Sequence, residues 1–98
     1  MLFVPEIPQE DLRKERALAR ALRGSTWWKR KRATGRCYYC GAHVSPGNLT
    51  MDHLVPLVRG GRSTKNNIVA ACKECNSRKK YLLPLEWETY LTSLSGDD

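Results

Sequence analysis

The sequence has no apolar run long enough to cross a membrane. Its first ten residues, MLFVPEIPQE, contain neither a basic start nor a small-residue cleavage site, so we expect no signal peptide, no membrane association and a cytoplasmic location. Thiols stay reduced in the cytoplasm, which argues against disulfides among the four cysteines. Internal repeats and low-complexity segments are also lacking. The 98 residues predict a single domain whose small core needs an additional source of stability.

Acidic residues are nearly absent from one long segment. Residues 13–36 contain ten basic residues and one acidic residue, Glu15, whereas both ends of the chain are acidic. The net charge is +7 and the pI is near 9.5. No wide apolar face accompanies this charge, which disfavours a membrane surface. Nucleic acid is the favoured partner, because Lys and Arg displace condensed counterions from phosphates.

A first helix is predicted from Pro8 to Arg23, with Gly24 as its natural end. Leu18 and Leu22 lie on one side of this helix and are expected to dock it. The opposite side carries a basic stripe, because arginines recur at steps of three and four residues. Such a stripe is either a solvated face or a surface that contacts DNA phosphates. It consists of Arg13, Arg16, Arg20 and Arg23.

A second short helix is predicted from a cap at Ser25 or Thr26 to the vicinity of Gly35. Trp27 and Trp28 point about 100° apart on a helix, so only one of them needs to face the core. We favour core or lid positions for both over base stacking. The basic residues of this segment, a second candidate DNA contact, are Lys29, Arg30, Lys31 and Arg32.

Two Cys-x-x-Cys pairs use all four cysteines of the chain. Two thiolates separated by two residues grip zinc from one side, and Gly41 allows the backbone to fold under the metal. The 31 residues between the pairs exceed the usual zinc-ribbon interval, so a structured insertion must lie between them. His43 is an alternative ligand, but four sulfurs make a surface role more plausible for it. The predicted structural zinc ligands are Cys37, Cys40, Cys72 and Cys75.

The remaining pattern predicts short strands at 48–51 and 68–71, with Asp52 and His53 directly after the first. A helix is expected from Cys72 to about residue 83, and Pro84 stops it. A last amphipathic helix is expected over 85–94. Its candidate core contacts are Leu85, Trp87, Leu91 and Leu94.

Asp52 and His53 together suit hydrolysis of a phosphodiester. That reaction needs charge neutralisation on the phosphate and an activated water. A divalent cation held by a carboxylate supplies the first, and a histidine of near-neutral pKa accepts the proton of the water. Adjacent side chains on a regular strand point in opposed directions, so the two residues are expected to play different roles.

The order of motifs over residues 37–80 resembles that of the HNH endonuclease family, which has the ββα-metal fold, in its zinc-stapled branch. The matching motifs are Cys37-x-x-Cys40, Asp52-His53-x-x-Pro56, Gly60-Gly61, Asn67-Ile68 and Cys72-x-x-Cys75-Asn76-x-x-Lys79. Several residue types are required in this order over the whole span, which makes the resemblance specific.

The resemblance implies a role for each matching residue. His53 would be the general base, and Asn67 would hold the loop between the strands so that His53 stays oriented. Asp52 and Asn76 would bind the catalytic cation, and their oxygen ligands suit Mg²⁺ or Mn²⁺ better than zinc. Lys79 matches a family position and is expected to contact phosphate, together with Arg78 and Lys80.

The sequence therefore predicts an α+β fold with a small ββα-metal core and a Cys₄ zinc site, flanked by N-terminal helices and a C-terminal helix. Within the single domain 1–98, residues 1–36 form an arm and the basic helices, 37–83 the zinc-stapled core, and 84–98 the last helix and tail. The predicted function is metal-dependent cleavage of DNA in a bacterial or phage-infected cell. The alternative is a zinc-stabilised DNA-binding module with little activity alone, which acts with a partner protein such as a phage packaging or recombination component.

Overall fold

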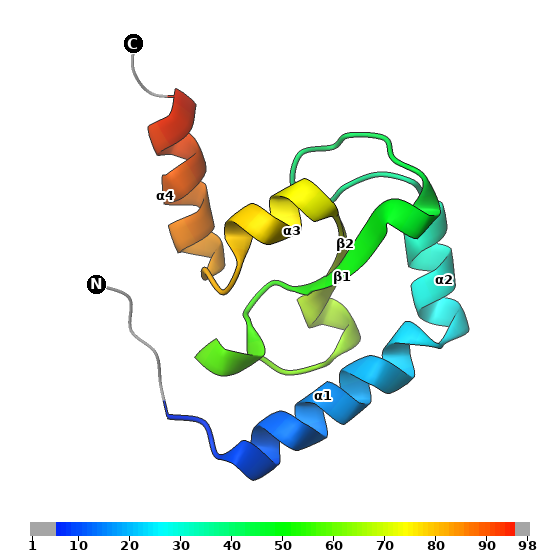
Figure 1. Cartoon of the computed structure of the whole chain (residues 1–98), viewed down its shortest axis with the longest axis vertical. Coiled ribbons are helices and arrows are strands. Elements are labelled where there is room, and N and C mark those ends of the chain that lie inside the picture. Colours follow the sequence, from blue (N-terminus) through cyan, green and yellow to red (C-terminus); the bar gives the residue numbers. More distant parts are fainter. Residues whose placement is uncertain (1–5, 96–98) are drawn as a thin grey trace.

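The computed structural model describes residues 6–95 of the chain. These residues form an α+β fold with a central two-stranded antiparallel sheet surrounded by helices (Figure 1). No helix within this range is both long and apolar enough to cross a membrane. The predicted fold class is confirmed. In chain order the helices and strands are α1 (Gln9–Arg23), α2 (Thr26–Ala33), β1 (Leu49–His53), β2 (Ile68–Cys72), α3 (Lys73–Lys79) and α4 (Pro84–Ser95).

The two strands and α3 form the ββα unit of the domain. β1 pairs with β2 from Leu49 opposite Cys72 to His53 opposite Ile68, and α3 begins directly after β2. β1 is longer than predicted, because its pairing continues through Asp52 and His53. α3 ends earlier than predicted, because Lys80 adopts a positive φ of 49° and reverses the chain.

The loop between the strands makes a sharp turn at two glycines. Gly60 has a φ of 95°, which favours glycine. At Gly61 a Cβ atom would lie 1.8 Å from the carbonyl oxygen of Val55, so no side chain fits there. The turn brings the following segment, 62–67, back along the end of β1.

The core lies between the sheet, α2 and the first cysteine pair. Trp28 is 2% exposed, and Trp27 is half-buried and packs against the same cluster, which agrees with the core or lid positions favoured for both tryptophans. β2 is buried from Ile68 to Ala71, which explains its unbroken run of apolar residues. The buried cluster consists of Trp28, Cys37, Leu49, Ile68, Ala70 and Ala71.

The docked side of α1 differs from the prediction. Leu18 is 51% exposed, and only Leu22 of the predicted pair packs against the core. Glu15 and Ala19 are the buried residues of α1 instead. The helix is therefore rotated so that a carboxylate faces the protein, where it binds groups of the loop after Gly61.

α4 contacts the rest of the domain through its first turns. Trp87 is 4% exposed, as predicted for a core contact, and Glu86 forms a bidentate ion pair with the buried Arg59 at 2.9 and 3.0 Å. The other predicted core contacts are wrong, because α4 extends away from the sheet (Figure 1) and their side chains are exposed in its first turn as well as in its later turns. Those exposed residues are Leu85, Leu91 and Leu94.

Candidate active site and zinc site

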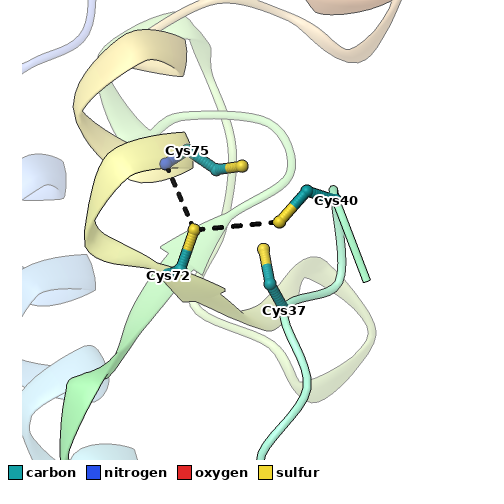
Figure 2. A group of neighbouring side chains, drawn as sticks. All are labelled: Cys37, Cys40, Cys72 and Cys75. Carbon is teal, nitrogen blue, oxygen red and sulfur yellow. Dashed lines mark hydrogen bonds between the residues drawn. The ribbon is translucent and has the colours of Figure 1, made fainter. Parts of the chain in front are cut away.

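The four cysteines converge from the loop after α2 and from the junction of β2 with α3 (Figure 2). Their sulfur atoms all lie within 4.8 Å of one another, and the sulfurs of Cys40 and Cys72 are 4.0 Å apart. A disulfide would need about 2.05 Å, and all four thiols are free. Zinc–sulfur bonds of about 2.3 Å in a tetrahedron place sulfurs nearly 4 Å apart. The cluster therefore fits one tetrahedral zinc ion.

Backbone N–H groups donate to two of the sulfurs and favour a thiolate at Cys37. The N–H groups of Tyr39 and Cys75 donate to the sulfurs of Cys37 and Cys72 at 3.3 and 3.4 Å. Burial alone would raise the pKa of the Cys37 thiol, but hydrogen bonds from neighbouring backbone N–H groups outweigh it and lower the pKa to about 7. Gly41 has a φ of 74°, so it folds the backbone under the sulfurs as predicted. His43 is exposed and binds Arg36 at 3.0 Å rather than joining the cluster.

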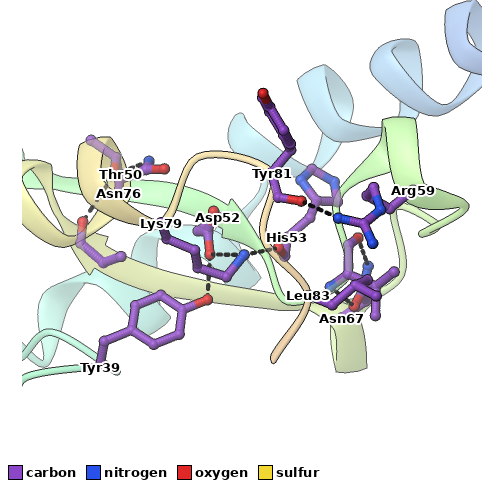
Figure 3. Close-up of polar contacts among 12 residues, drawn as sticks. Tyr39, Thr50, Asp52, His53, Arg59, Asn67, Asn76, Lys79, Tyr81 and Leu83 are labelled. Atoms are coloured by element: carbon purple, nitrogen blue, oxygen red, sulfur yellow. Dashed lines mark hydrogen bonds and ion pairs between the residues drawn. The ribbon is translucent and has the colours of Figure 1, made fainter. Parts of the chain in front are cut away.

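Asp52 lies on β1 with its carboxylate facing Lys79 of α3 and Tyr39 (Figure 3). The hydroxyl of Tyr39 donates to its Oδ2 atom, and Nζ of Lys79 lies 3.3 Å from the same oxygen. Burial chiefly, and then the hydrogen bond to Asp52 and the charge of that carboxylate, raise the pKa of the Tyr39 phenol, which keeps it a proton donor. Both contacts use Oδ2, so they leave Oδ1 for another ligand.

Lys79 differs from its predicted role. It was expected at an exposed helix end in contact with phosphate, but it is 0% exposed. Besides its ion pair with Asp52, Nζ donates to the carbonyl oxygen of His53 at 3.0 Å. α3 packs against β1, and the side chain of Lys79 is directed toward the strand, which removes it from solvent. The lysine neutralises the carboxylate instead of reaching outward.

Asn76 lies three residues before Lys79 on α3 and therefore faces the same strand. Its Nδ2 atom donates to the hydroxyl of Thr50 at 2.7 Å, and this hydroxyl donates to the carbonyl oxygen of Ala71 at 2.9 Å. Thr50 and Asp52 are two residues apart on β1 and share a face. Asp52 and Asn76 therefore lie on packed elements, and carboxylate and amide oxygens are ligand types that Mg²⁺ and Mn²⁺ prefer.

His53 contacts a different part of the molecule from Asp52. Its Nε2 atom lies 3.0 Å from the hydroxyl of Ser63, which follows the glycine turn. Burial chiefly lowers the pKa of His53, and the positive charges of Arg23 and Lys79 lower it further against the opposing charges of Asp52 and Glu15. The imidazole is therefore neutral around pH 7 and able to accept a proton.

Asn67 ties the two ends of the loop between the strands together. Its Oδ1 accepts from the N–H of Val55 at 3.0 Å, and its Nδ2 donates to the carbonyl oxygens of Val55 and Arg62 at 3.1 and 2.8 Å. These are the side-chain to backbone contacts expected from the family pattern. They fix the segment that directly follows His53.

The basic residues predicted to contact DNA lie mainly at the surface. Arg78 is half-exposed and forms an ion pair with Glu74 at 3.0 Å, while Lys80 is exposed. Lys31 is partly buried and stacks over Trp27, with Nζ 5.4 Å from the ring centroid. Arg32 is also partly buried. The exposed members of the two N-terminal helices are Arg13, Arg16, Arg20, Arg23, Lys29 and Arg30.

Sequence reasoning missed three residues that touch the site. Tyr39 lies inside the first cysteine pair and Ser63 in the loop between the strands, and no sequence motif marks either residue. Glu15 had a usable signal, because it is the one carboxylate among ten basic residues in segment 13–36. An isolated acidic residue on a basic helix indicates a specific partner, and here the partners are Ser63 and Arg62.

Comparison with known proteins agrees with this geometry. A family model described as HNH endonuclease matches residues 37–89, which is more than half of the chain. A CRISPR-associated endonuclease Cas9 from Corynebacterium diphtheriae is 40% identical over 50 residues, or 50% of this chain. The chain spans only 5% of the length of that relative. The family match includes both strands, α3 and all four cysteines, and the chain therefore belongs to the HNH endonuclease family.

Proposed function

We propose that this domain hydrolyses DNA phosphodiester bonds with the help of one divalent cation. The observation that carries the proposal is the position of Asp52 and Asn76: Asp52 lies on β1 and faces α3, and Asn76 lies on α3 and binds Thr50 of the same strand. His53 is the next residue on β1. Family membership supports the nuclease activity. DNA as substrate, the single cation and the roles of the three residues are the parts that experiment must test.

Each side chain has a distinct task in this reaction. His53 accepts the proton of the attacking water, for which burial keeps its imidazole neutral. Asp52 and Asn76 would hold Mg²⁺ or Mn²⁺ through oxygen atoms, and the bound cation supplies charge neutralisation at the phosphate. Asn67 keeps the loop after His53 in place through its three hydrogen bonds. The Cys₄ site would hold a structural zinc ion that folds the domain.

DNA would be held by charge rather than by base contacts. The arginines of α1 form a stripe on its exposed side, and Arg23 lies close enough to His53 to lower its pKa. A phosphate backbone that follows this stripe would therefore pass near the proposed base. Such contacts give affinity without reading sequence.

A plasmid-nicking assay tests the proposal. The zinc-loaded wild type is expected to nick supercoiled plasmid with Mg²⁺ or Mn²⁺ and to stop when these ions are omitted. His53→Ala is expected to lose about 10²- to 10⁴-fold in rate while it keeps its fold and DNA affinity. His43→Ala is the matched control, because His43 is exposed and its ring binds Arg36 rather than a residue of the candidate site. Wild-type nicking by His53→Ala would remove His53 as the base.

One observation favours a second function. The carboxylate of Asp52 is already neutralised by Lys79, which a divalent cation would have to compete with. This arrangement suits a DNA-binding module with little activity alone that a partner protein, such as a phage packaging component, completes. Absence of nicking with either metal, together with retained DNA binding, would favour this alternative.

A further inference from the structure

Ser63 connects the proposed base to the N-terminal helix. Its hydroxyl lies 3.0 Å from Nε2 of His53 on one side and donates to the backbone carbonyl oxygen of Glu15 at 2.7 Å on the other. The backbone N–H of Ser63 also donates to Oε1 of Glu15 at 2.6 Å. The hydroxyl of Ser63 thus joins β1, the loop after the glycine turn and α1. Figure 1 shows this loop beside α1.

The proton positions in this chain follow from the acceptors. A serine hydroxyl has one proton, and a carbonyl oxygen can only accept. Ser63 therefore donates its hydroxyl proton to the carbonyl oxygen of Glu15. The hydroxyl oxygen of Ser63 can then only accept a hydrogen bond from His53. Nε2 of His53 must then carry a proton. In the neutral imidazole this leaves Nδ1 with the lone pair that takes a proton from water.

Glu15 fixes Ser63 by more than one bond. Its carboxylate binds the N–H of Ser63 through Oε1 and the guanidinium of Arg62 through Oε2 at 2.9 Å. Glu15 itself is 8% exposed, and α1 is anchored further by the buried Ala19. Ser63 is 6% exposed and is held through both its backbone N–H and its hydroxyl, which restricts the imidazole bound to it.

We propose that Ser63 and Glu15 are positioning residues that hold His53 in its Nε2–H tautomer, with Nδ1 as the catalytic nitrogen. This rests on the proposed role of His53 as the general base. The sequence motifs assign no function to either residue, and Glu15 lies outside residues 37–89, which match the family model. The N-terminal helix is accordingly part of the active site rather than only a basic surface.

Nitrogen NMR of the histidine rings tests the tautomer directly. The full, zinc-loaded chain labelled with ¹⁵N-histidine has two ring systems to observe, His43 and His53. His43 is an internal reference of opposite kind, because Arg36 can only donate to its Nε2 and so favours the Nδ1–H form. At a pH where both rings are neutral, His53 is expected to show a single Nε2–H tautomer. Ser63→Ala is expected to give a mixture, and Ser63→Thr to restore the wild-type spectrum.

Kinetics of plasmid nicking provide the functional readout. Ser63→Ala is expected to lower kcat by about 10- to 100-fold, which is typical of lost partners behind a site histidine, with little change in KM. Ser63→Thr should recover most of this loss. Ser25→Ala is the matched control, because it removes a hydroxyl that caps α2 at Trp28 and does not contact His53. A purely structural effect would lower the stability of both alanine variants and leave the tautomer unchanged.

The two proposals fail in different ways. If Ser63→Ala keeps one Nε2–H tautomer and the wild-type kcat, the positioning role is overturned while the base remains. If the wild type does not nick DNA but Ser63→Ala still produces the mixed tautomer, the positioning contact stands and the proposed activity is wrong. Glu15→Ala should move the tautomer in the same direction as Ser63→Ala, and Glu15→Gln should not, because its amide oxygen still accepts from Ser63. A Glu15→Ala variant with an unchanged spectrum would remove Glu15 from the proposal.

Discussion

Replacement of Lys79 by methionine removes one partner of the buried ion pair and keeps most of the apolar stem. Nζ and Oδ2 of Asp52 are 3.3 Å apart, and two unit charges at that distance attract by about 5 kcal/mol at an effective dielectric constant of about 20. Lys79 is 0% exposed, so water cannot take the place of the lost charge next to Asp52. Breaking such a pair costs about 3–5 kcal/mol. We expect a loss of that size in the free energy of unfolding.

Urea unfolding of the zinc-loaded protein, followed by circular dichroism, measures this loss as a lower midpoint at unchanged slope. Lys73→Met is the matched control on α3, because Lys73 is exposed, and should change stability by less than about 0.5 kcal/mol. The double variant Lys79→Met with Asp52→Asn should lose less than the sum of the two single losses. A loss below about 1 kcal/mol for Lys79→Met, or strict additivity, would refute the buried pair.

Three further predictions concern the zinc site, pH and DNA binding. Cys72→Ser should lower the zinc content of the purified protein well below about one equivalent and abolish cooperative unfolding, as measured by elemental analysis and circular dichroism. The hydrogen bond from the Ser63 backbone chiefly lowers the pKa of Glu15 from 4.5, so its stabilisation is present above that value and is lost as pH falls through the lower folded pKa. Glu15→Gln should therefore flatten the decrease in melting temperature below about pH 4.5, whereas Glu10→Gln on the exposed first turn should not; equal curves would contradict the bond. Replacing all four arginines of the α1 stripe by glutamine should reduce the slope of log affinity against log salt by up to about 3.6, measured by fluorescence anisotropy with a DNA duplex; an unchanged slope would show that the stripe is only solvated.

The ββα unit and the cysteine cluster followed from the sequence because their signals are local. Turn glycines, a strand of four buried residues and two Cys-x-x-Cys pairs each depend on a few neighbouring positions. The family pattern then added Asp52, His53 and Asn76. The contacts that complete the site are of another kind, because Ser63 meets Glu15 across 48 residues of sequence.

The errors have a common physical cause. Leu18 and Leu85 were assigned to the core by hydrophobic periodicity, but periodicity does not say which other element covers a face. Lys79 was expected to contact phosphate, and Glu15 had no predicted contact, yet both are buried because each has a partner of opposite charge in the fold. Burial of a charged residue depends on pairing, and pairing between distant segments is not visible in one sequence.

The register of β1 against β2 determines which face of the strand Asp52 and His53 occupy. Asp52 pairs with Val69 and His53 with Ile68, and a slip by one residue would exchange the faces of all side chains on the strand. The carboxylate would then point toward α1 and the imidazole toward α3, so both would lose their partners. Contacts at both ends of the strand pair oppose this slip. Cys72 belongs to the cysteine cluster at one end, and Asn67 accepts a hydrogen bond from the N–H of Val55 at the other. An ion bound by the cysteines would thus help to hold Asp52 and His53 in their register, at a distance from both side chains.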